Sequence, residues 1–385
     1  MELWRAPVLR EDAETERRVT WIELFFDLAF VALVSALSGG LARHIGFAAA
    51  AQWALYFGSM WAVWRYGAIY ADRFETDDVS YRLSLLGLMA AVVIMAVSAA
   101  EGFSAGFRGF GIGYILADAL ILALWRRGGR HNPRFRPMGL RLTAAHGASI
   151  VLWIAAILVG LPLGWLLAAT GTAVDLLAPL VTTRQQGALP RLSSTHLPER
   201  FGTFTIIVLG EGLLAMVSGL SRLPYRSVLA WLTAALMLLM LTGFYWLYFD
   251  QVMTGDPPRS SGRRVIRQYL HLPLTMGIAA ISAVVAEMLE APLGTFSTSS
   301  RLLFAMGVAG VLGSIAILEA LAFRRERGDN WLGQASLLEG GAACVMLLLA
   351  VAVPGATPLA LLAVAVAMVV GVVAWGASAR TSPDS

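Results

Sequence analysis

Seven carboxylates stand out within the long apolar stretches of this 385-residue chain, together with one arginine and one histidine. Because an ionised group is costly in an apolar interior, each acid needs an opposite charge, a proton or a bound cation. The excess of acids over bases therefore favours protons or cations over anions as the species that this interior handles. The acids are Glu23, Asp27, Asp118, Asp175, Glu211, Glu319 and Glu339, and the two basic residues are Arg65 and His146.

The first two acids form a pair. Glu23 and Asp27 are four residues apart, which puts both on one face of a helix, one turn apart. Helical rise places Asp27 about 10 Å into its apolar stretch, and Arg65 lies at a similar depth in the next stretch, which runs the other way. We therefore expect Arg65 to pair with Glu23 or Asp27. The pair either locks two helices together or acts as a gate whose pairing changes during transport.

Glu211 is the most informative single position. It lies near the middle of its apolar stretch, between Gly210 and Gly212. Glycines at such a point let another helix or a ligand approach closely. Transporters place coupling sites at this depth, so Glu211 is our first candidate for a coupling carboxylate. The alternative is a structural hydrogen bond to a neighbouring helix.

The remaining buried groups are weaker candidates. Asp118 and Asp175 join Glu211, Glu23, Asp27 and Arg65 as transport or coupling candidates, with His146 as a proton relay. Glu319 and Glu339 lie near the ends of their stretches, where hydration by the surrounding water is the simpler expectation. The full set of transport candidates is Glu211, Asp27, Glu23, Arg65, Asp118, His146 and Asp175.

Further polar residues lie at the edges of the apolar stretches. His196 and Glu199 have a spacing found among metal ligands, but a single His-x-x-Glu without a second cluster is weak evidence for a metal site. We predict no metal, and an interfacial cluster of structural residues instead. The secondary candidates are His196, Glu199, Arg200, His271, Glu319 and Glu339.

The sequence carries no other signal of enzymatic chemistry. It has no glycine-rich phosphate loop and no nucleophile motif of the Gly-x-Ser-x-Gly type, so no cofactor is predicted. Cys344 is the one cysteine, which excludes an intrachain disulfide. We therefore expect that the protein is not an enzyme, although an intramembrane enzyme stays among the alternatives.

Composition determines the elements that must position these residues. The chain is 58% hydrophobic and 14% charged, with a mean hydropathy of +0.69. Soluble domains carry about 25% charged residues, so this chain is predicted to be an all-α integral membrane bundle. Twelve stretches are long enough to cross a bilayer. They are Thr20–Arg43, Gly46–Tyr70, Ser80–Ala100, Phe110–Trp125, Met138–Gly160, Leu163–Val181, Phe201–Leu220, Ser227–Phe249, Leu270–Leu289, Leu302–Phe323, Leu332–Val353 and Pro358–Ala377.

The arginines predict the orientation. With the N-terminus in the cytoplasm, 23 of the 29 arginines fall on the cytoplasmic side and five on the other. This bias matches the positive-inside rule, so both termini are expected in the cytoplasm and the protein in the bacterial inner membrane. The basic loops account for the high isoelectric point, and no nucleic acid is expected as a partner.

Two local patterns mark expected helix ends. Thr76-Asp77-Asp78 precedes the third stretch, where an acidic side chain would cap the helix. Tryptophans near the ends of stretches are typical of the membrane interface, and we expect this placement for four of them. They are Trp4, Trp21, Trp125 and Trp231.

The chain also shows signs of an internal duplication. Thr20 and Thr203, like Ala32 and Ala215, are separated by 183 residues, and each pair lies in a corresponding stretch. This predicts two six-helix halves, 1–183 and 184–385, within one membrane domain. Because six is even, the halves would be parallel repeats related by an axis along the membrane normal.

Several motifs together resemble the low temperature requirement protein A family of bacterial membrane proteins. They are Val19-Thr20-Trp21-Ile22-Glu23-Leu24-Phe25-Phe26-Asp27-Leu28, Arg73-Phe74-Glu75-Thr76-Asp77-Asp78, Glu199-Arg200-Phe201-Gly202-Thr203-Phe204-Thr205-Ile206-Ile207-Val208-Leu209-Gly210-Glu211 and Tyr269-Leu270-His271-Leu272-Pro273. The resemblance implies a multi-span membrane protein of a family named for a cold-growth phenotype. It assigns neither an activity nor catalytic residues.

Three functions remain open from the sequence. The acid-rich interior favours a transporter or channel for protons, cations or a small cationic solute. An intramembrane enzyme acting on a lipid or isoprenoid could use the same carboxylates as acid–base groups or Mg²⁺ ligands. A non-catalytic membrane assembly factor would use them only to specify helix packing. The lipid bilayer is the expected partner in each case, and a homo-oligomer is compatible with all three.

Overall fold

The predicted all-α membrane bundle is confirmed by the computed structural model, which describes residues 3–10, 19–255, 258, 260–322 and 330–381. Eleven helices of the described residues are long and apolar enough to cross a membrane. The only strands among these residues, β1 (Val8–Leu9) and β2 (Phe74–Glu75), form a short antiparallel pair. Arginines 17, 18, 259, 324, 325 and 327, which contribute to the predicted orientation, lie outside the described residues, and the orientation stays a prediction.

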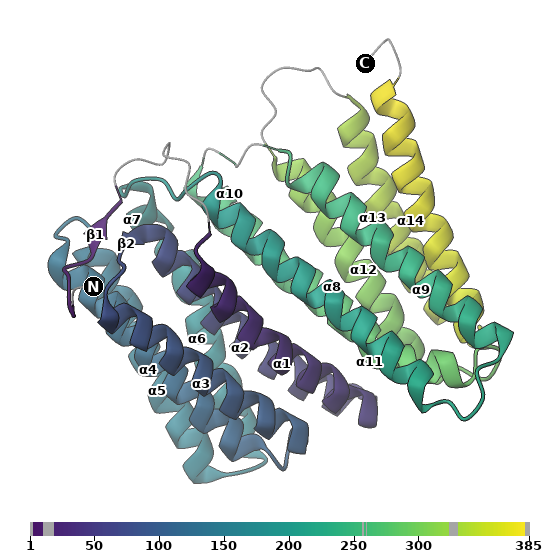
Figure 1. Ribbon diagram of the computed structural model, residues 1–385, viewed down its shortest axis with the longest axis horizontal. Coiled ribbons are helices and arrows are strands. Elements are labelled where there is room, and N and C mark those ends of the chain that lie inside the picture. The colour runs from purple at the N-terminus through teal and green to yellow at the C-terminus, as the bar shows by residue number, and fades with distance from the viewer. Residues whose placement is uncertain (1–2, 11–18, 256–257, 259, 323–329, 382–385) are drawn as a thin grey trace. The chain divides into compact units, whose positions relative to one another are not determined.

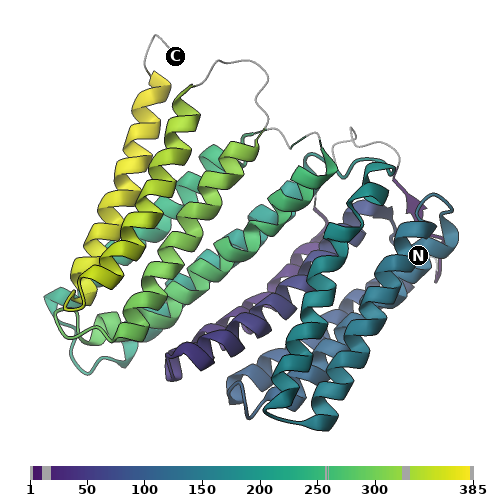
Figure 2. The same cartoon turned by 180° about the vertical axis from the view of Figure 1, so that it is seen from behind.

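The chain divides into two compact units. Unit 1 comprises 1–40, 48–204 and 260–265, and unit 2 comprises the rest. Figures 1 and 2 show the helices of each unit from two sides. The first unit contains most of α1 (Trp21–Arg43), α2 (Phe47–Arg73), α3 (Val79–Glu101), α4 (Phe107–His131), α5 (Arg136–Val159), α6 (Leu163–Val181), α7 (Thr183–Gly187) and the first residues of α8 (His196–Arg222).

Unit 2 begins within α8, at Thr205. Its other elements are α9 (Val228–Leu247), the π-helix η1 (Tyr248–Val252), most of α10 (Ser261–Tyr269), α11 (His271–Glu290), α12 (Thr298–Leu321), α13 (Asn330–Ala352) and α14 (Pro358–Thr381). The predicted division into the halves 1–183 and 184–385 stays a prediction. The internal duplication itself remains a prediction.

All twelve predicted stretches correspond to helices, with ends shifted by a few residues. The largest difference is α4, which is 25 residues long because its helix continues through Arg126 and Arg127 to His131. Of the helices that match the twelve predicted stretches, α2 falls outside the eleven apolar ones. At 27 residues it is long enough to cross, but it carries Arg65 and several tyrosines and tryptophans.

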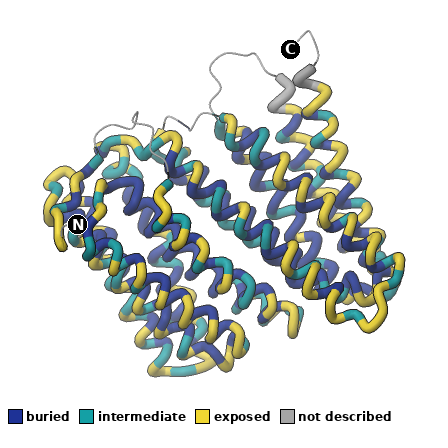
Figure 3. The backbone as a smooth tube through the Cα atoms, viewed as in Figure 1, coloured by how far each residue is buried: buried dark blue, intermediate teal, exposed yellow. Residues whose placement is uncertain are grey.

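Helix α2 forms the core of unit 1. Every residue from Tyr56 to Arg73 is buried, and Figure 3 shows the buried positions in dark blue. Polar and aromatic side chains are tolerated there because other helices of the unit surround this one. Its contacts include α8, where the Trp64 ring stacks on Phe204, and α6, where Ser59 hydrogen-bonds to Thr172. The helix thus positions polar groups that lipid would not accept.

The predicted cap at α3 is confirmed. Asp78 is the N-cap residue, and its side chain accepts a hydrogen bond from the amide of Tyr81. It also accepts from the amide of Arg5 and from the guanidinium of Arg127, which ties the N-terminal segment and α4 to the start of α3. Burial opposes ionisation of this carboxyl, but these hydrogen bonds outweigh it and hold the pKa of Asp78 below its ordinary value.

One expectation about the tryptophans is wrong. Trp4, Trp21 and Trp231 are more than half exposed, as interfacial residues would be. Trp125 is instead 1% exposed and packs on Phe135, because α4 continues well past it and α5 folds back against it. Its position at the end of an apolar stretch did not reveal that neighbour.

Candidate functional site

Two pairs of residues on α1 and α8 face each other in unit 1. Glu23 and Asp27 are one turn apart on α1, and His196 and Arg200 have the same spacing at the start of α8. Both pairs therefore project from one side of their helix. They meet residue for residue, since His196 contacts Glu23 and Arg200 contacts Asp27. We call these four residues and Asp72 the arginine–histidine cluster.

The strongest contact in this cluster joins Arg200 to Asp27. Nε of Arg200 donates to Oδ2 at 2.9 Å and Nη2 donates to Oδ1 at 2.6 Å, a geometry specific to a guanidinium and a carboxylate. The Trp64 indole also donates to Oδ1, at 2.8 Å. We expected Arg65 to pair with Glu23 or Asp27, and the expectation is wrong for Asp27. Arg65 follows Trp64 in α2, so its side chain leaves the helix on another face, where its guanidinium lies 5.6 Å from the ring centroid of Tyr66.

His196 lies between two acids. Its Nδ1 is 2.9 Å from Asp72 Oδ1, and its Nε2 is 3.3 Å from Glu23 Oε2. Glu23 also faces Nη1 of Arg200 at 3.8 Å and accepts from the amide of Thr20. The second oxygen of Asp72 accepts from a loop amide, that of Ser193. An imidazole placed between two carboxylates can donate from both nitrogens only when it carries a second proton.

The sequence did not identify Asp72. It lies at the end of α2 next to Arg73, where a charged residue is ordinary, and it is 2% exposed. It becomes part of the cluster through the loop that brings His196 to it. Glu199, by contrast, is an exposed residue of the first turn of α8, as expected for an interfacial acid.

A second cluster forms at the centre of unit 1 from three consecutive helices. Asp118 of α4, His146 of α5 and Asp175 of α6 were separate candidates in the sequence, and the structure brings them together. Nδ1 of His146 lies 2.5 Å from Asp118 Oδ1 and 3.1 Å from Asp175 Oδ1. We call these three residues the aspartate–histidine cluster. All three are at most 2% exposed.

Surrounding side chains hold this cluster in place. Tyr114, one turn before Asp118, donates to Asp175 Oδ2 at 2.5 Å. Tyr66 of α2 donates to the backbone carbonyl of Asp175 at 2.7 Å, and its ring packs edge-on against His146 with centroids 4.4 Å apart. These contacts explain why aromatic residues in α2 and α4 are buried next to charged groups.

The aspartate–histidine cluster has unused bonding capacity. Among the described residues, Asp118 Oδ2 and His146 Nε2 have no hydrogen-bond partner, and Asp175 Oδ1 has none beyond its ionic contact. One nitrogen and two carboxylate oxygens lie within 4.8 Å of one another, which is close enough to hold a single cation. The sequence could not reveal this group because its members are 28 and 29 residues apart.

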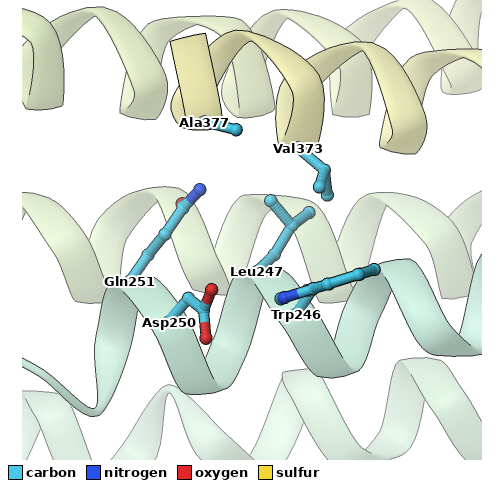
Figure 4. Close-up of a pocket in the computed structure, with 6 residues that line it drawn as sticks. All are labelled: Trp246, Leu247, Asp250, Gln251, Val373 and Ala377. Carbon is cyan, nitrogen blue, oxygen red and sulfur yellow. The ribbon is translucent and has the colours of Figure 1, made fainter. Parts of the chain in front are cut away.

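A third acidic group lies in unit 2. Glu319 of α12 and Glu339 of α13 are 5% and 0% exposed, so the expectation that water hydrates them is wrong. With its amide nitrogen turned toward them, Gln251 of η1 donates to Glu339 Oε1 at 3.0 Å and to Glu319 Oε1. Gln251 also lines a pocket of about 220 Å³ next to α14, and Figure 4 shows its amide extending toward Ala377.

The remaining candidates are buried within unit 2 but join none of these clusters. Glu211 is 4% exposed, and the following Gly212 lies against Leu241 of α9, which is the close approach expected at that glycine. The imidazole of His271 bridges the Tyr248 hydroxyl and the Arg267 carbonyl at 2.9 Å each. Both bonds are satisfied by a neutral ring, which indicates a structural role for His271.

Comparisons with known proteins agree with this architecture. The sequence profile described as "Bacterial low temperature requirement A protein (LtrA)" matches residues 18–374. The chain is 29% identical over 306 residues to the uncharacterized protein RA0937 of Rhizobium meliloti (strain 1021), covering 70% of this chain and 69% of that protein. No solved structure matches it. Since the matching region contains all three clusters and nearly every helix, the chain belongs to the bacterial low temperature requirement A family.

Proposed function

We propose that this protein is a transporter or channel that moves a cation across the bacterial inner membrane. The aspartate–histidine cluster is the binding centre within unit 1. The observation that carries the proposal is the charge balance of that cluster. Two ionised aspartates and a neutral imidazole carry two negative charges, and protonation of the imidazole still leaves one.

Such an imbalance is costly among membrane helices. A buried charge is retained only when another group, a proton or an ion compensates it. Among the described residues, the side chains that contact the carboxylates of Asp118 and Asp175 are those of the cluster itself and that of Tyr114, which carries no charge. The centre therefore gains most from a cation that enters from water, and a protein that binds and releases such a cation can transport it.

The arginine–histidine cluster supports the same role from another place in unit 1. It holds Asp27 rigidly through Arg200 but leaves His196 between two acids, Glu23 and Asp72. Transfer of one proton to or from His196 changes which of these contacts are ionic. The contacts among helices α1, α2 and α8 can therefore depend on whether His196 is protonated.

Flux measurements on purified protein in liposomes test the proposal. Vesicles containing the wild-type chain should show an ion-dependent change in internal pH or in the signal of a metal-sensitive dye. Asp118→Asn and Asp175→Asn should reduce that flux to the level of protein-free vesicles, because each removes one of the charges that attract the cation. Asp77→Asn, an exposed acid outside the clusters, serves as the matched control and should retain wild-type flux.

Absence of flux for protons and for a series of mono- and divalent cations, in folded and correctly inserted wild-type protein, would contradict the proposal. Wild-type flux in both aspartate variants would contradict the assignment of the binding centre. If no ion shows flux, the buried acids would act only in helix packing, as expected for a non-catalytic membrane assembly factor.

A further inference from the structure

We propose that Asp118, His146 and Asp175 bind one divalent first-row metal ion, in the series from Mn²⁺ to Zn²⁺. This names the cation of the proposed function. Its transport rests on that function, whereas metal binding can be tested without any flux. The proposal stands on the convergence of three ligand atoms from α4, α5 and α6 within 4.8 Å.

The donor set selects the class of ion. One imidazole nitrogen with two carboxylate oxygens is a mixed nitrogen–oxygen set, which suits zinc, manganese and ferrous iron. Magnesium and calcium prefer sites composed of oxygen alone, and monovalent copper prefers sulfur. The three residues of the cluster include no cysteine.

Charge balance points to a divalent ion. Two ionised aspartates and a neutral His146 neutralise one divalent cation completely, which is the state that a low-dielectric interior favours. A monovalent ion would leave one negative charge, as would a single proton. Without a metal, the cluster needs two protons for neutrality, one on the imidazole and one on an aspartate. Tyr114 and Tyr66 contribute hydrogen bonds without charge, so they do not alter this balance.

The atoms needed for coordination are available. Asp118 Oδ2 is buried and has no hydrogen-bond partner among the described residues, and Asp175 Oδ1 has only the contact with the imidazole. Tyr114 holds the other oxygen of Asp175, which orients the carboxylate as an outer-shell donor would.

The present distances require only a small adjustment. Metal–ligand bonds of about 2.1 Å separate two ligand atoms by roughly 3 Å. Asp175 Oδ1 already lies 3.1 Å from His146 Nδ1, whereas Asp118 Oδ1 lies at 2.5 Å. A rotation of the Asp118 carboxylate would relieve this short contact and present its unpartnered Oδ2 to the metal. Water can complete the coordination shell.

Equilibrium dialysis of the purified full-length chain tests the site. The protein is prepared in a Cys344→Ala background, which removes the exposed thiol, and is stripped with a chelator. We expect one equivalent of Zn²⁺ or Mn²⁺ per chain in the presence of excess Mg²⁺. The doubly substituted Asp118→Asn/Asp175→Asn chain should lack it, and Tyr114→Phe should bind about 10- to 100-fold more weakly.

A control and a spectroscopic measurement guard against misfolded variants. Glu287→Gln removes a carboxylate in unit 2 that is hydrogen-bonded to Ser300, and it should bind metal as the parent does. In the parent itself, electron paramagnetic resonance of bound Mn²⁺ should detect coupling to a single imidazole nitrogen, and His146→Gln should abolish that coupling.

Each outcome is decisive for one of the two proposals. The metal site would be overturned if the parent chain bound no more metal than the double aspartate variant. It would also be overturned if bound Mn²⁺ in the parent showed no coupling to nitrogen. Proton flux without metal binding would leave the transport function standing and refute this site. Stoichiometric metal binding without metal flux would confirm the site and refute its role in transport.

Discussion

Arg200 of α8 holds Asp27 of α1 by two parallel hydrogen bonds, although 173 residues separate them in the chain. The guanidinium is 1% exposed and the carboxylate 0%. In such a setting the net contribution of an ion pair to stability is small, but loss of one partner leaves the other charge buried and uncompensated. The pair therefore specifies how α1 and α8 pack.

Removal of one partner of this pair should be more harmful than removal of both. Arg200→Ala is expected to lower the free energy of unfolding by about 3–5 kcal/mol. The double variant Asp27→Asn/Arg200→Gln should recover part of that loss, because no buried charge remains. Thermal unfolding in detergent measures both. If the Arg200→Ala chain is as stable as the double variant, the prediction is wrong, because Asp27 then does not remain as an uncompensated buried charge when Arg200 is removed.

Asp78 should make stability depend on pH. Its folded pKa lies below the unfolded value of about 3.9, so the carboxylate stabilises the fold above that pH and this contribution is lost as the pH falls through the folded pKa. Asp78→Asn should reduce stability at pH 7 by about 1–3 kcal/mol, and the difference from wild type should shrink below about pH 4.

The neighbouring acid provides the control for Asp78. Asp77 is 70% exposed and pairs with Arg82 on the surface. Asp77→Asn should therefore change stability by less than about 1 kcal/mol. Equal effects of the two substitutions at pH 7 would show that the contacts of Asp78 with Arg5, Tyr81 and Arg127 contribute no more than an exposed pair.

Glu339 should tolerate loss of its charge. Glu339→Gln keeps the shape of the side chain and removes a buried charge next to Glu319, so we expect unchanged or higher thermal stability. Gln251→Leu removes the donor shared by both acids and should cost about 1–3 kcal/mol. A Glu339→Gln chain less stable than the Gln251→Leu chain would mean that the ionised carboxylate is required.

The predicted orientation can be tested with single cysteines in a Cys344→Ala background. Arg134→Cys, in the turn between α4 and α5, should react with an impermeant thiol reagent only in inside-out vesicles. Ser104→Cys, in the turn between α3 and α4, should react in intact spheroplasts. Both positions are exposed, so reagent access differs only by membrane side. Labelling of Arg134→Cys in spheroplasts would rule out a cytoplasmic N-terminus with this arrangement of helices.

The sequence alone determined the membrane class and the positions of the helices. Long apolar stretches require helices in a bilayer, since every backbone group must be hydrogen-bonded internally, and this holds whatever the helices pack against. The spacing of Glu23 and Asp27 also placed both on one helical face, because that depends only on helix geometry. The cap at Asp78 followed from the local sequence for the same reason.

Which buried polar side chains contact one another was decided only by the tertiary structure. Depth along the sequence favoured Arg65 as the cation for Asp27, and only the packing of α8 against α1 assigns Arg200 to it. Asp118, His146 and Asp175 occupy three different helices, so their convergence depends on the rotation of each helix about its axis. Apolar faces that resemble one another do not encode that rotation locally. It is set by the summed packing of many side chains, which no single stretch of the chain contains.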